Sequence, residues 1–240
     1  MTTYETKLRK REEVAEGTTA FHFDKPPGFS FKPGQAIEVV LIDPPNVDAQ
    51  SGRHTFSLVS APYEGDLVVA TRMRDSTFKR ALRSLPIDSS VQLDGPFGSL
   101  TLHNNHARPA VFIAGGIGIT PFMSILRQAA KDRLPQRLLL VYSNRRPEDT
   151  AFLAELRQLE QLNKNFRLIA TMTRMNQSSR AWEGETRLID EELVKEVGGD
   201  LSAPVYYLAG PPALVEAVRQ TLNHAGIDDD DIRSEEFYGY

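Results

Sequence analysis

Short apolar or alternating segments, separated by turn-forming clusters, make up the first part of the chain. The clusters, such as DKPPG and YEG, are rich in proline and glycine. One helix is predicted at 76–84. Strands are predicted at 19–23, 36–42, 55–60, 66–73 and 91–95. This spacing favours a small antiparallel β barrel over an open sandwich.

From residue 110 onward the pattern changes to strands that alternate with helices. Strands are predicted at 110–114, 137–143, 166–172, 205–210 and 231–237, and helices near 121–131, 149–161, 190–197 and 211–225. Such alternation is typical of a parallel, doubly wound sheet. The polar segment HNNHARP separates the two patterns, so we expect one domain over 1–104 and a second over 105–240.

Composition narrows the class of protein. The net charge is −4 and no basic stripe interleaves with aromatic residues, so nucleic acid is not an expected partner. No apolar stretch of about 18 residues and no charged-then-apolar leader occur, so we expect no membrane insertion and a soluble, cytoplasmic protein. The chain has no cysteine, which excludes disulfides and cysteine-ligated iron–sulfur clusters within it. The five histidines lack ligand spacing, so no metal site is predicted.

The stretch AGGIGITPFMSIL joins the apolar strand at 110–114 to the helix that follows. Thr120 is expected to cap that helix, and Pro121 suits its first position. Gly115, Gly116 and Gly118 remove β-carbons from the bend, so a diphosphate could lie on backbone amides at the positive end of the helix. A tight turn without a ligand is the alternative, because Pro121 replaces the third glycine of the usual dinucleotide fingerprint.

Four patches recur in the same order in one known family. They are RHTFSLVSAP at 53–62, GGIGITP at 115–121, AGPPALV at 209–215 and the terminal EEFYGY. With these patches the chain resembles the ferredoxin-NADP reductase family of flavoproteins over essentially its whole length. The resemblance implies a Greek-key barrel that holds FAD, or less often FMN, and an α/β domain that holds NADPH or NADH.

The resemblance assigns roles to the strand at 55–60. Phe56 is expected to pack against the flavin, and the Ser57 hydroxyl to lie near the flavin N5, where hydride arrives. Ser57 is therefore the first catalytic candidate. The alternative for Ser57 is a strand serine that bonds to the backbone.

Arginine side chains and the N-terminus of a helix, called a helix opening below, are expected to hold the flavin phosphates. Arg53 and Arg72 are the arginine candidates, and Ser76 and Thr77 begin the helix. The family arginine stands two residues before the aromatic, where this chain has His54. Because strand side chains alternate, a shift of one residue turns Arg53 to the other face unless a bulge intervenes, so Arg72 or His54 is expected to substitute.

The later patches are expected to line the nicotinamide side. The resemblance implies that Phe237 covers the flavin with Glu236 or Glu235 nearby; we take Glu236 as the second catalytic candidate. Tyr240 is a further candidate for stacking on the ring, with a frayed tail as the alternative. Many relatives have cysteine before the GPP glycine, where this chain has Ala209, so no thiol contact is available. The nucleotide contacts expected from the patch itself are Gly210, Pro211 and Pro212.

The choice between NADPH and NADH is expected at the end of the second α/β strand, in YSNRRPED. Arginine and serine there match a ribose 2′-phosphate, whereas an acidic group matches a 2′-hydroxyl. Ser143, Arg145 and Arg146 therefore favour NADPH. The alternative is that both arginines are solvated loop charges.

The sequence therefore predicts a flavin-dependent NAD(P)H oxidoreductase. Hydride would pass from the nicotinamide to flavin N5 in a cleft between the domains, and electrons then to a separate acceptor, a ferredoxin-like protein or a small molecule. One rival hypothesis is a nucleotide-binding regulatory or electron-transfer subunit of a larger redox complex. Another is a dehydrogenase without flavin, which leaves the first hundred or so residues without a role.

Overall fold

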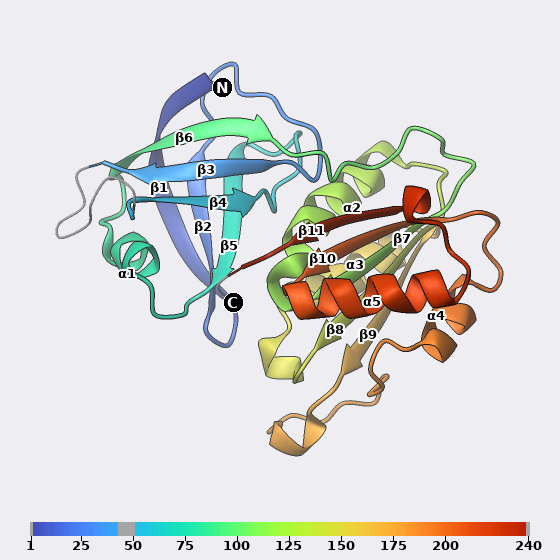
Figure 1. Cartoon of the computed structure of the whole chain (residues 1–240). Helices are drawn as coiled ribbons and strands as arrows, with labels where there is room; N and C mark the ends of the chain where they lie inside the picture. Colours follow the sequence, from blue (N-terminus) through green and yellow to red (C-terminus); the bar gives the residue numbers. More distant parts are fainter. Residues whose placement is uncertain (1, 43–50, 239–240) are drawn as a thin grey trace. The chain divides into compact units, whose positions relative to one another are not determined.

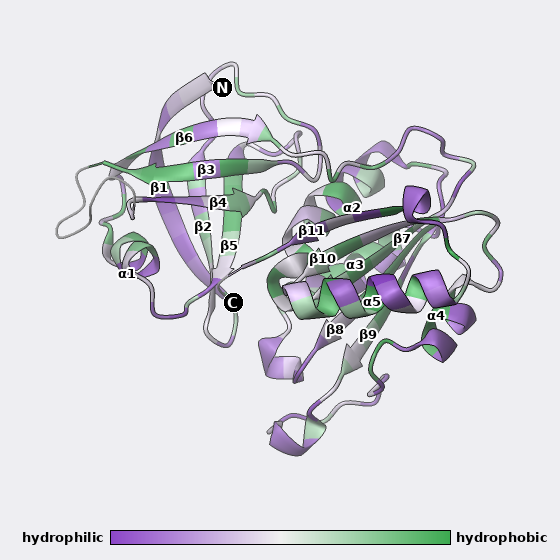
Figure 2. Ribbon diagram, viewed as in Figure 1, coloured by the Kyte–Doolittle hydropathy of each residue, from purple (hydrophilic) through white to green (hydrophobic). Residues whose placement is uncertain are grey.

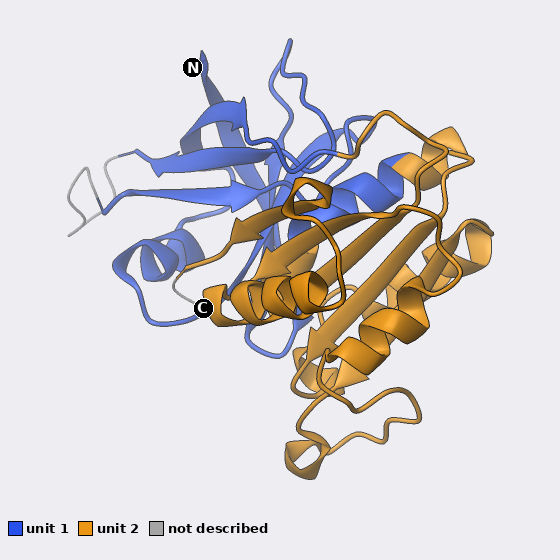
Figure 3. Cartoon of the chain, turned by 45° about the vertical axis from the view of Figure 1, so that its right-hand side comes forward, with its two compact units in different colours: residues 1–101, 120–128 blue, residues 102–119, 129–240 orange. Residues whose placement is uncertain are grey.

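The computed structural model describes residues 2–42 and 51–238 of the 240-residue chain. The chain divides into two compact units, which Figure 3 distinguishes by colour. Unit 1 comprises residues 1–101 together with 120–128, and unit 2 comprises 102–119 together with 129–240. The functional domain boundary near residue 105 stays a prediction.

Unit 1 contains a six-stranded antiparallel sheet in the order β4-β3-β6-β1-β2-β5. The residues after β4 close the sheet into a barrel, because Leu58 bridges Val69 and the Val59 N–H donates to the Val68 carbonyl at 2.8 Å. The strands are β1 (Thr2–Ala15), β2 (Thr18–Asp24), β3 (Ala36–Leu41), β4 (Arg53–Ser57), β5 (Asp66–Arg72) and β6 (Ser90–Phe97) (Figure 1).

The barrel core comes from alternating side chains. In β3, Ile37 and Val39 are completely buried while Glu38 between them stays partly exposed. Strand β1 departs from this pattern, since only Thr6 and Leu8 among its 14 residues are buried. Figure 2 shows β1 as largely hydrophilic, which explains why hydrophobic periodicity does not predict it.

Helix α1 (Thr77–Ser84) interrupts the strands where the sequence predicts a helix. Ser76 is its N-cap, and the Ser76 hydroxyl accepts a hydrogen bond from the Lys79 amide at 3.2 Å. Phe78 and Leu82 turn inward and join the barrel core. Their spacing of four residues explains why this short helix buries one face.

Unit 2 contains a five-stranded parallel sheet in the order β11-β10-β7-β8-β9. The chain moves outward from β7 in one direction and then returns to place β10 on its other side, so a topological switch point lies between β7 and β10. The strands are β7 (Ala110–Gly115), β8 (Leu138–Asn144), β9 (Phe166–Met172), β10 (Val205–Gly210) and β11 (Ile232–Glu236).

Helices and 3₁₀ segments connect these strands. Residues of α4 and α5, including Leu193, Val215 and Leu222, pack against one face of the sheet. On the other face Tyr142 is buried and its hydroxyl donates to the Ala151 carbonyl at 3.3 Å. The helices are α2 (Thr120–Asp132), α3 (Leu153–Leu162), α4 (Glu191–Gly198) and α5 (Pro212–His224), and the 3₁₀ segments are η1 (Gly116–Ile119), η2 (Pro147–Asp149), η3 (Met175–Gln177) and η4 (Asp229–Asp231).

The predicted combination of an antiparallel barrel and a parallel doubly wound sheet is confirmed. Every predicted strand and helix is present within a few residues of its expected bounds. Within 2–42 and 51–238, no helix has the length and apolar character needed to span a membrane. The same residues contain no group of three or more acidic or histidine side chains arranged to hold a metal ion.

Candidate functional site

The carboxyl ends of the parallel strands in unit 2 form one edge of the sheet. In register across this edge, Gly115 pairs with Ser143, and Gly210 pairs with Glu236. The Phe237 N–H extends the ladder by donating to the Gly210 carbonyl at 2.9 Å. Five of the predicted site residues are therefore held on one frame at the switch point, where open α/β sheets bind their ligands.

The three glycines of the turn after β7 have different reasons to be glycine. A β-carbon on Gly118 would lie 2.2 Å from the Ala209 carbonyl oxygen, so Gly118 permits close packing of two backbones. A β-carbon on Gly115 would meet Leu214 at 2.7 Å. Gly116, at φ +54°, has open space where its β-carbon would be. Only Gly116 thus leaves the room for a ligand that the sequence predicts for all three.

The start of α2 corrects one expectation. Thr120 is not the N-cap: that position is Ile119, at φ −65° and ψ −23°, and no side chain caps this end. The reason is that η1 runs directly into α2, so the amides at the turn are already in helical conformation. Pro121 therefore stands at the second helical position rather than at the predicted first, still within the first turn, and that turn carries no acidic residue.

The GPP patch follows β10 in the predicted way. Gly210 adopts φ +152°, and a β-carbon on it would lie 3.0 Å from the Gly115 carbonyl oxygen. Pro211 is exposed and is the N-cap residue of α5, and Pro212 begins that helix. A second helix opening, again without an acidic residue in its first turn, therefore lies beside the first glycine turn.

The residues predicted to select the nucleotide separate into two kinds. Arg146 forms two hydrogen bonds with Asp149, whose side chain is buried. Arg145 is exposed, and Ser143 is partly exposed at the end of β8. Arg146 is thus committed to a structural ion pair, which leaves Arg145 and Ser143 as the predicted residues with accessible groups at this edge.

Residues 173 and 174 join this edge, and the sequence reasoning missed them. The Thr173 N–H donates to the Asn144 carbonyl at 2.9 Å, and the Arg174 N–H donates to the Arg145 carbonyl at 2.8 Å. The β8–β9 ladder therefore continues past both strands and places exposed Arg174 beside Arg145. A serine- or threonine-arginine pair straight after a parallel strand is the signal that could have revealed it.

In unit 1 the predicted flavin-site residues lie on two faces of β4. His54 and Phe56 face the barrel core, where their ring centroids are 4.7 Å apart and Phe78 of α1 lies within 6 Å of each. Burial lowers the pKa of His54, and nearby Lys79 lowers it further, so His54 is neutral at pH 7. The packing of Phe56 against a flavin stays a prediction; in the structure its ring contacts His54 and Phe78.

Arg53 and Ser57 lie on the opposite face of β4 from Phe56. Arg53 forms an ion pair with Glu38 of β3 at 3.1 Å, as the alternation of strand side chains leads one to expect. Ser57 pairs with Ala36 and is 5% exposed. Arg53 thus has a local carboxylate partner, whereas Ser57 lies at the buried end of the strand.

Basic groups collect near the opening of α1. The Lys79 ammonium is buried and donates to the Arg72 carbonyl at 3.1 Å, and burial lowers its pKa. Arg72 is partly exposed and Thr77 is exposed. The first turn of α1 has no acidic residue, and Asp75, just before the cap, is paired with Arg80, so this end combines the positive end of a helix with basic side chains.

The two glutamates at the end of β11 differ in environment. Glu235 is partly exposed, and burial raises its pKa above the ordinary value. Glu236 is exposed and accepts a hydrogen bond from the Tyr238 hydroxyl. Phe237 is partly exposed. Tyr240 lies outside the described residues.

These features fit the two groups that the sequence predicts. A dinucleotide needs backbone amides that can be approached closely and a helix N-terminus without an acidic residue in its first turn, and the open turn at Gly116 and the start of α5 meet both needs. A flavin with phosphates needs a cationic helix opening beside a strand hydroxyl and aromatic rings, and unit 1 supplies them around α1 and β4.

Comparison with known proteins agrees with this geometry. Residues 112–220 match the family model described as the oxidoreductase NAD-binding domain. The whole chain superposes on a ferredoxin NADP⁺ reductase from Neisseria gonorrhoeae, solved with FAD and NADP, with a TM-score of 0.82, 22% identity and coverage of 98% of this chain and 99% of that one. Residues 112–220 are therefore similar to the NAD-binding domain of oxidoreductases. The chain has the fold of the ferredoxin-NADP reductase family, which confirms the resemblance inferred from the sequence.

Similar sequences include reductase components of oxygenase systems. The glycine betaine monooxygenase reductase subunit of Chromohalobacter salexigens is 27% identical over 92% of this chain and 60% of its own length. The propane 2-monooxygenase reductase component of Rhodococcus jostii is 26% identical over 89% of this chain and 57% of its own length. This chain therefore spans about three-fifths of the length of the relatives it matches.

Proposed function

We propose that the protein is a flavin-dependent NAD(P)H oxidoreductase that delivers electrons to a separate acceptor. The observation that carries the proposal is the open, left-handed turn at Gly116, set beside the α5 opening at the switch point of the sheet. When bound, a flavin accepts hydride from a reduced nicotinamide and can release the electrons singly. The residues of this chain supply binding, orientation and exclusion of water.

The turn at Gly116 and the two helix openings beside it would hold the nucleotide diphosphate. The amides of η1 and the first turn of α2 act as fixed donors, and neither helix opening carries an acidic residue in its first turn. A β-carbon on Gly210 would lie 3.0 Å from the Gly115 carbonyl oxygen, so glycine at this position lets the ends of β10 and β7 pack closely.

The adenosine end would extend along the edge toward β8 and β9. Arg145 and Arg174 are neighbours there through the hydrogen bond between their backbones, with Ser143 and Thr173 close by. Two exposed guanidinium groups match a 2′-phosphate, which favours NADPH over NADH. Arg146 has no part in this selection, because Asp149 engages it.

In unit 1, Ser57 would orient the flavin ring and the α1 opening would hold its phosphates. The hydroxyl of Ser76 already caps the helix, so the ligand would meet backbone amides there rather than that side chain. Arg72 would add positive charge. This second phosphate-holding device supports FAD, the longer cofactor, over FMN.

Glu235 is the better catalytic carboxylate of the terminal pair. Its pKa is raised by burial, so it can keep a proton to nearer neutrality than an exposed carboxyl can. Glu236 instead accepts from Tyr238. Glu235 would hold or transfer a proton near the nicotinamide, in the role that the sequence assigns first to Glu236.

The acceptor would be another chain or a small molecule. These 240 residues contain no cysteine, so they cannot themselves hold a cysteine-ligated cluster. The named relatives are reductase components of oxygenases, and a ferredoxin-like carrier or an oxygenase component is the acceptor we propose here. A cytoplasmic location belongs to the same proposal, since NAD(P)H is supplied there.

The test is reconstitution followed by turnover. The full chain is incubated with FAD or FMN, desalted, and its released chromophore identified by mass; NADPH and NADH oxidation is then followed with ferricyanide as acceptor. Bound FAD and rapid turnover are expected. Failure to retain flavin would contradict the proposal, and flavin retention without turnover would favour a regulatory subunit.

A further inference from the structure

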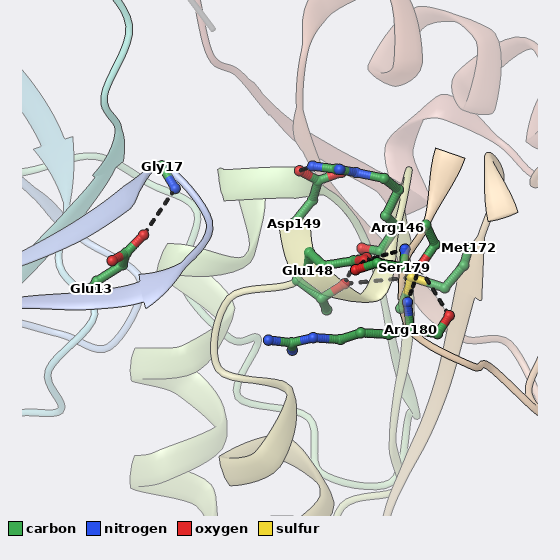
Figure 4. A network of polar contacts seen from close by, with 10 residues as sticks. Glu13, Gly17, Arg146, Glu148, Asp149, Met172, Ser179 and Arg180 are labelled. Carbon is green, nitrogen blue, oxygen red and sulfur yellow. Dashed lines mark hydrogen bonds and ion pairs between the residues drawn. The ribbon is translucent and has the colours of Figure 1, made fainter. Parts of the chain in front are cut away.

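A buried carboxylate holds two distant segments of unit 2 together. Glu148, in η2, is 7% exposed. Its oxygens accept from the Ser179 amide at 2.7 Å and the Ser179 hydroxyl at 2.8 Å (Figure 4). The Ser178 hydroxyl also donates to them, at 2.9 and 3.0 Å. Among the described residues, no basic side chain forms an ion pair with Glu148.

Burial of this carboxylate has a cost that its hydrogen bonds offset. Burial alone would raise the pKa of Glu148, but the donors of its own backbone, Ser179 and Ser178 lower it to about 2. Buried carboxylates are usually paired with a basic side chain, so a buried glutamate held only by neutral hydrogen-bond donors is unusual. The contact therefore fixes geometry, since an apolar pair could stabilise the same packing without the burial of a charge.

The segment fixed in this way is the one that carries Arg174. At its start, Thr173 and Arg174 are tied by their amides to Asn144 and Arg145. After the single turn of η3, Ser178 and Ser179 return to Glu148. Both ends of the segment at 173–179 are thus attached to the segment at 144–148, and Arg174 has little freedom to move relative to Arg145.

We propose that Glu148, Ser178 and Ser179 form a clamp that positions Arg174 for the 2′-phosphate of the nucleotide. The clamp residues act through Arg174 and touch no ligand themselves. The inference rests on the proposed function, because it assumes that the edge holding Arg145 and Arg174 receives the adenosine end. The clamp would explain how Glu148, a buried residue without positive charge, affects the choice between NADPH and NADH.

The binding of two fragments of the nucleotide can test the clamp without a measurement of turnover. Calorimetry on the full, flavin-loaded chain would give dissociation constants for adenosine 2′,5′-bisphosphate and for ADP. For Glu148→Gln we expect the bisphosphate to bind about fivefold more weakly and ADP to change less than about twofold. Amide hydrogen exchange at 174–179 should be faster in the same variant.

Matched variants separate positioning from general stability. Glu160→Gln is the control, because Glu160 also accepts from a backbone amide, that of Leu168 at 2.8 Å, away from the clamp. Ser179→Ala should weaken bisphosphate binding, and Ser179→Thr should restore it, since threonine retains the hydroxyl. Glu160→Gln should leave the ratio of the two dissociation constants unchanged.

The outcomes are distinguishable. If Glu148→Gln leaves the ratio of the dissociation constants for the bisphosphate and ADP unchanged, because both ligands bind as before or are weakened equally, the clamp is overturned. Turnover by the wild-type chain would still support the proposed function in that case. Binding of neither fragment by the wild-type chain would overturn both.

Discussion

Arg146 and Asp149 are joined by two hydrogen bonds, from Nε to Oδ2 at 3.0 Å and from Nη2 to Oδ1 at 2.9 Å. The Asp149 side chain is only 3% exposed, and that of Arg146 is 24% exposed. A bidentate pair of this kind restricts the guanidinium to one orientation. Arg146 is thus held by Asp149 while the adjacent Arg145 is exposed, and substitution should separate their effects.

Arg146→Ala should destabilise the fold and leave nucleotide choice intact. Loss of the guanidinium removes two hydrogen bonds from the buried Asp149 carboxylate, which we expect to lower the free energy of unfolding by about 2 kcal/mol, reduced from the fully buried case because Arg146 is partly exposed. Arg145→Ala, at an exposed position, should change stability by less than about 0.5 kcal/mol and raise the KM for NADPH. Urea unfolding and steady-state kinetics on both variants measure this. Loss of NADPH preference in Arg146→Ala at full stability would contradict it.

Gly118 and Gly116 should respond differently to alanine. Gly118→Ala brings its β-carbon to 2.2 Å from the Ala209 carbonyl oxygen, so we expect a loss of at least about 3 kcal/mol in stability. Gly116→Ala meets open space and should cost about 1 kcal/mol, from its left-handed backbone alone.

Gly116→Ala should also weaken the binding of NADPH. The added methyl group of Gly116→Ala would project where the diphosphate is proposed to lie, so its dissociation constant for NADPH should rise about tenfold. Chemical denaturation and fluorescence titration provide the two readouts. Equal stability losses at both positions, or unaltered NADPH binding by Gly116→Ala, would be inconsistent with the assigned roles.

Ser57→Ala should slow reduction of the flavin without releasing it. The change removes one hydroxyl at a buried strand end, and we expect the rate of reduction by NADPH to fall about tenfold. Thr55→Ala is the matched control, because Thr55 lies on the same face of β4 but is exposed. Rapid-mixing absorbance and flavin content are measured together. A rate that does not change in Ser57→Ala would remove this residue from the site.

Acid stability should depend on two glutamates in unit 2. Hydrogen bonds, the largest from the Arg187 side chain, lower the pKa of Glu185 from the ordinary value of 4.5 to about 2. The hydrogen-bond donors at the clamp likewise lower the pKa of Glu148 to about 2. Both groups bind protons more weakly when folded, so their contribution is present above pH 4.5 and is lost as the pH falls toward 2.

The double variant Glu148→Gln, Glu185→Gln tests this dependence. It should be less stable than wild type at neutral pH, and its stability should change less between pH 5 and 2. Denaturation midpoints across this pH range provide the measurement. Parallel curves for the two proteins would show that these carboxyls have ordinary pKa values.

Local patterns predicted most of the fold. Strand β7 is a continuous apolar run, and α1 places Phe78 and Leu82 four residues apart, so periodicity identified both. Strand β1 was missed because its partners β2 and β6, rather than its own polar side chains, hold it in the sheet. Pairing across the barrel is a tertiary effect that a local pattern cannot contain.

The geometry of the candidate site could be predicted where it follows from the local sequence, and it was missed where it depends on contacts between distant residues. The turn at Gly116 follows from strand, glycine and helix in sequence. The partner of Arg146 was three residues away but depended on a 3₁₀ turn. Glu148 meets Ser178 and Ser179 about 30 residues later, after a helix and a strand, so only the folded chain brings them together.

Anaerobic mixing of the FAD-loaded chain with NADPH tests whether this chain passes hydride from a nicotinamide to a flavin. We expect the visible absorption of bound flavin to bleach with one equivalent of NADPH and to return when an electron acceptor is added. A flavin that stays bound and oxidised in the presence of both excess NADPH and excess NADH would contradict it.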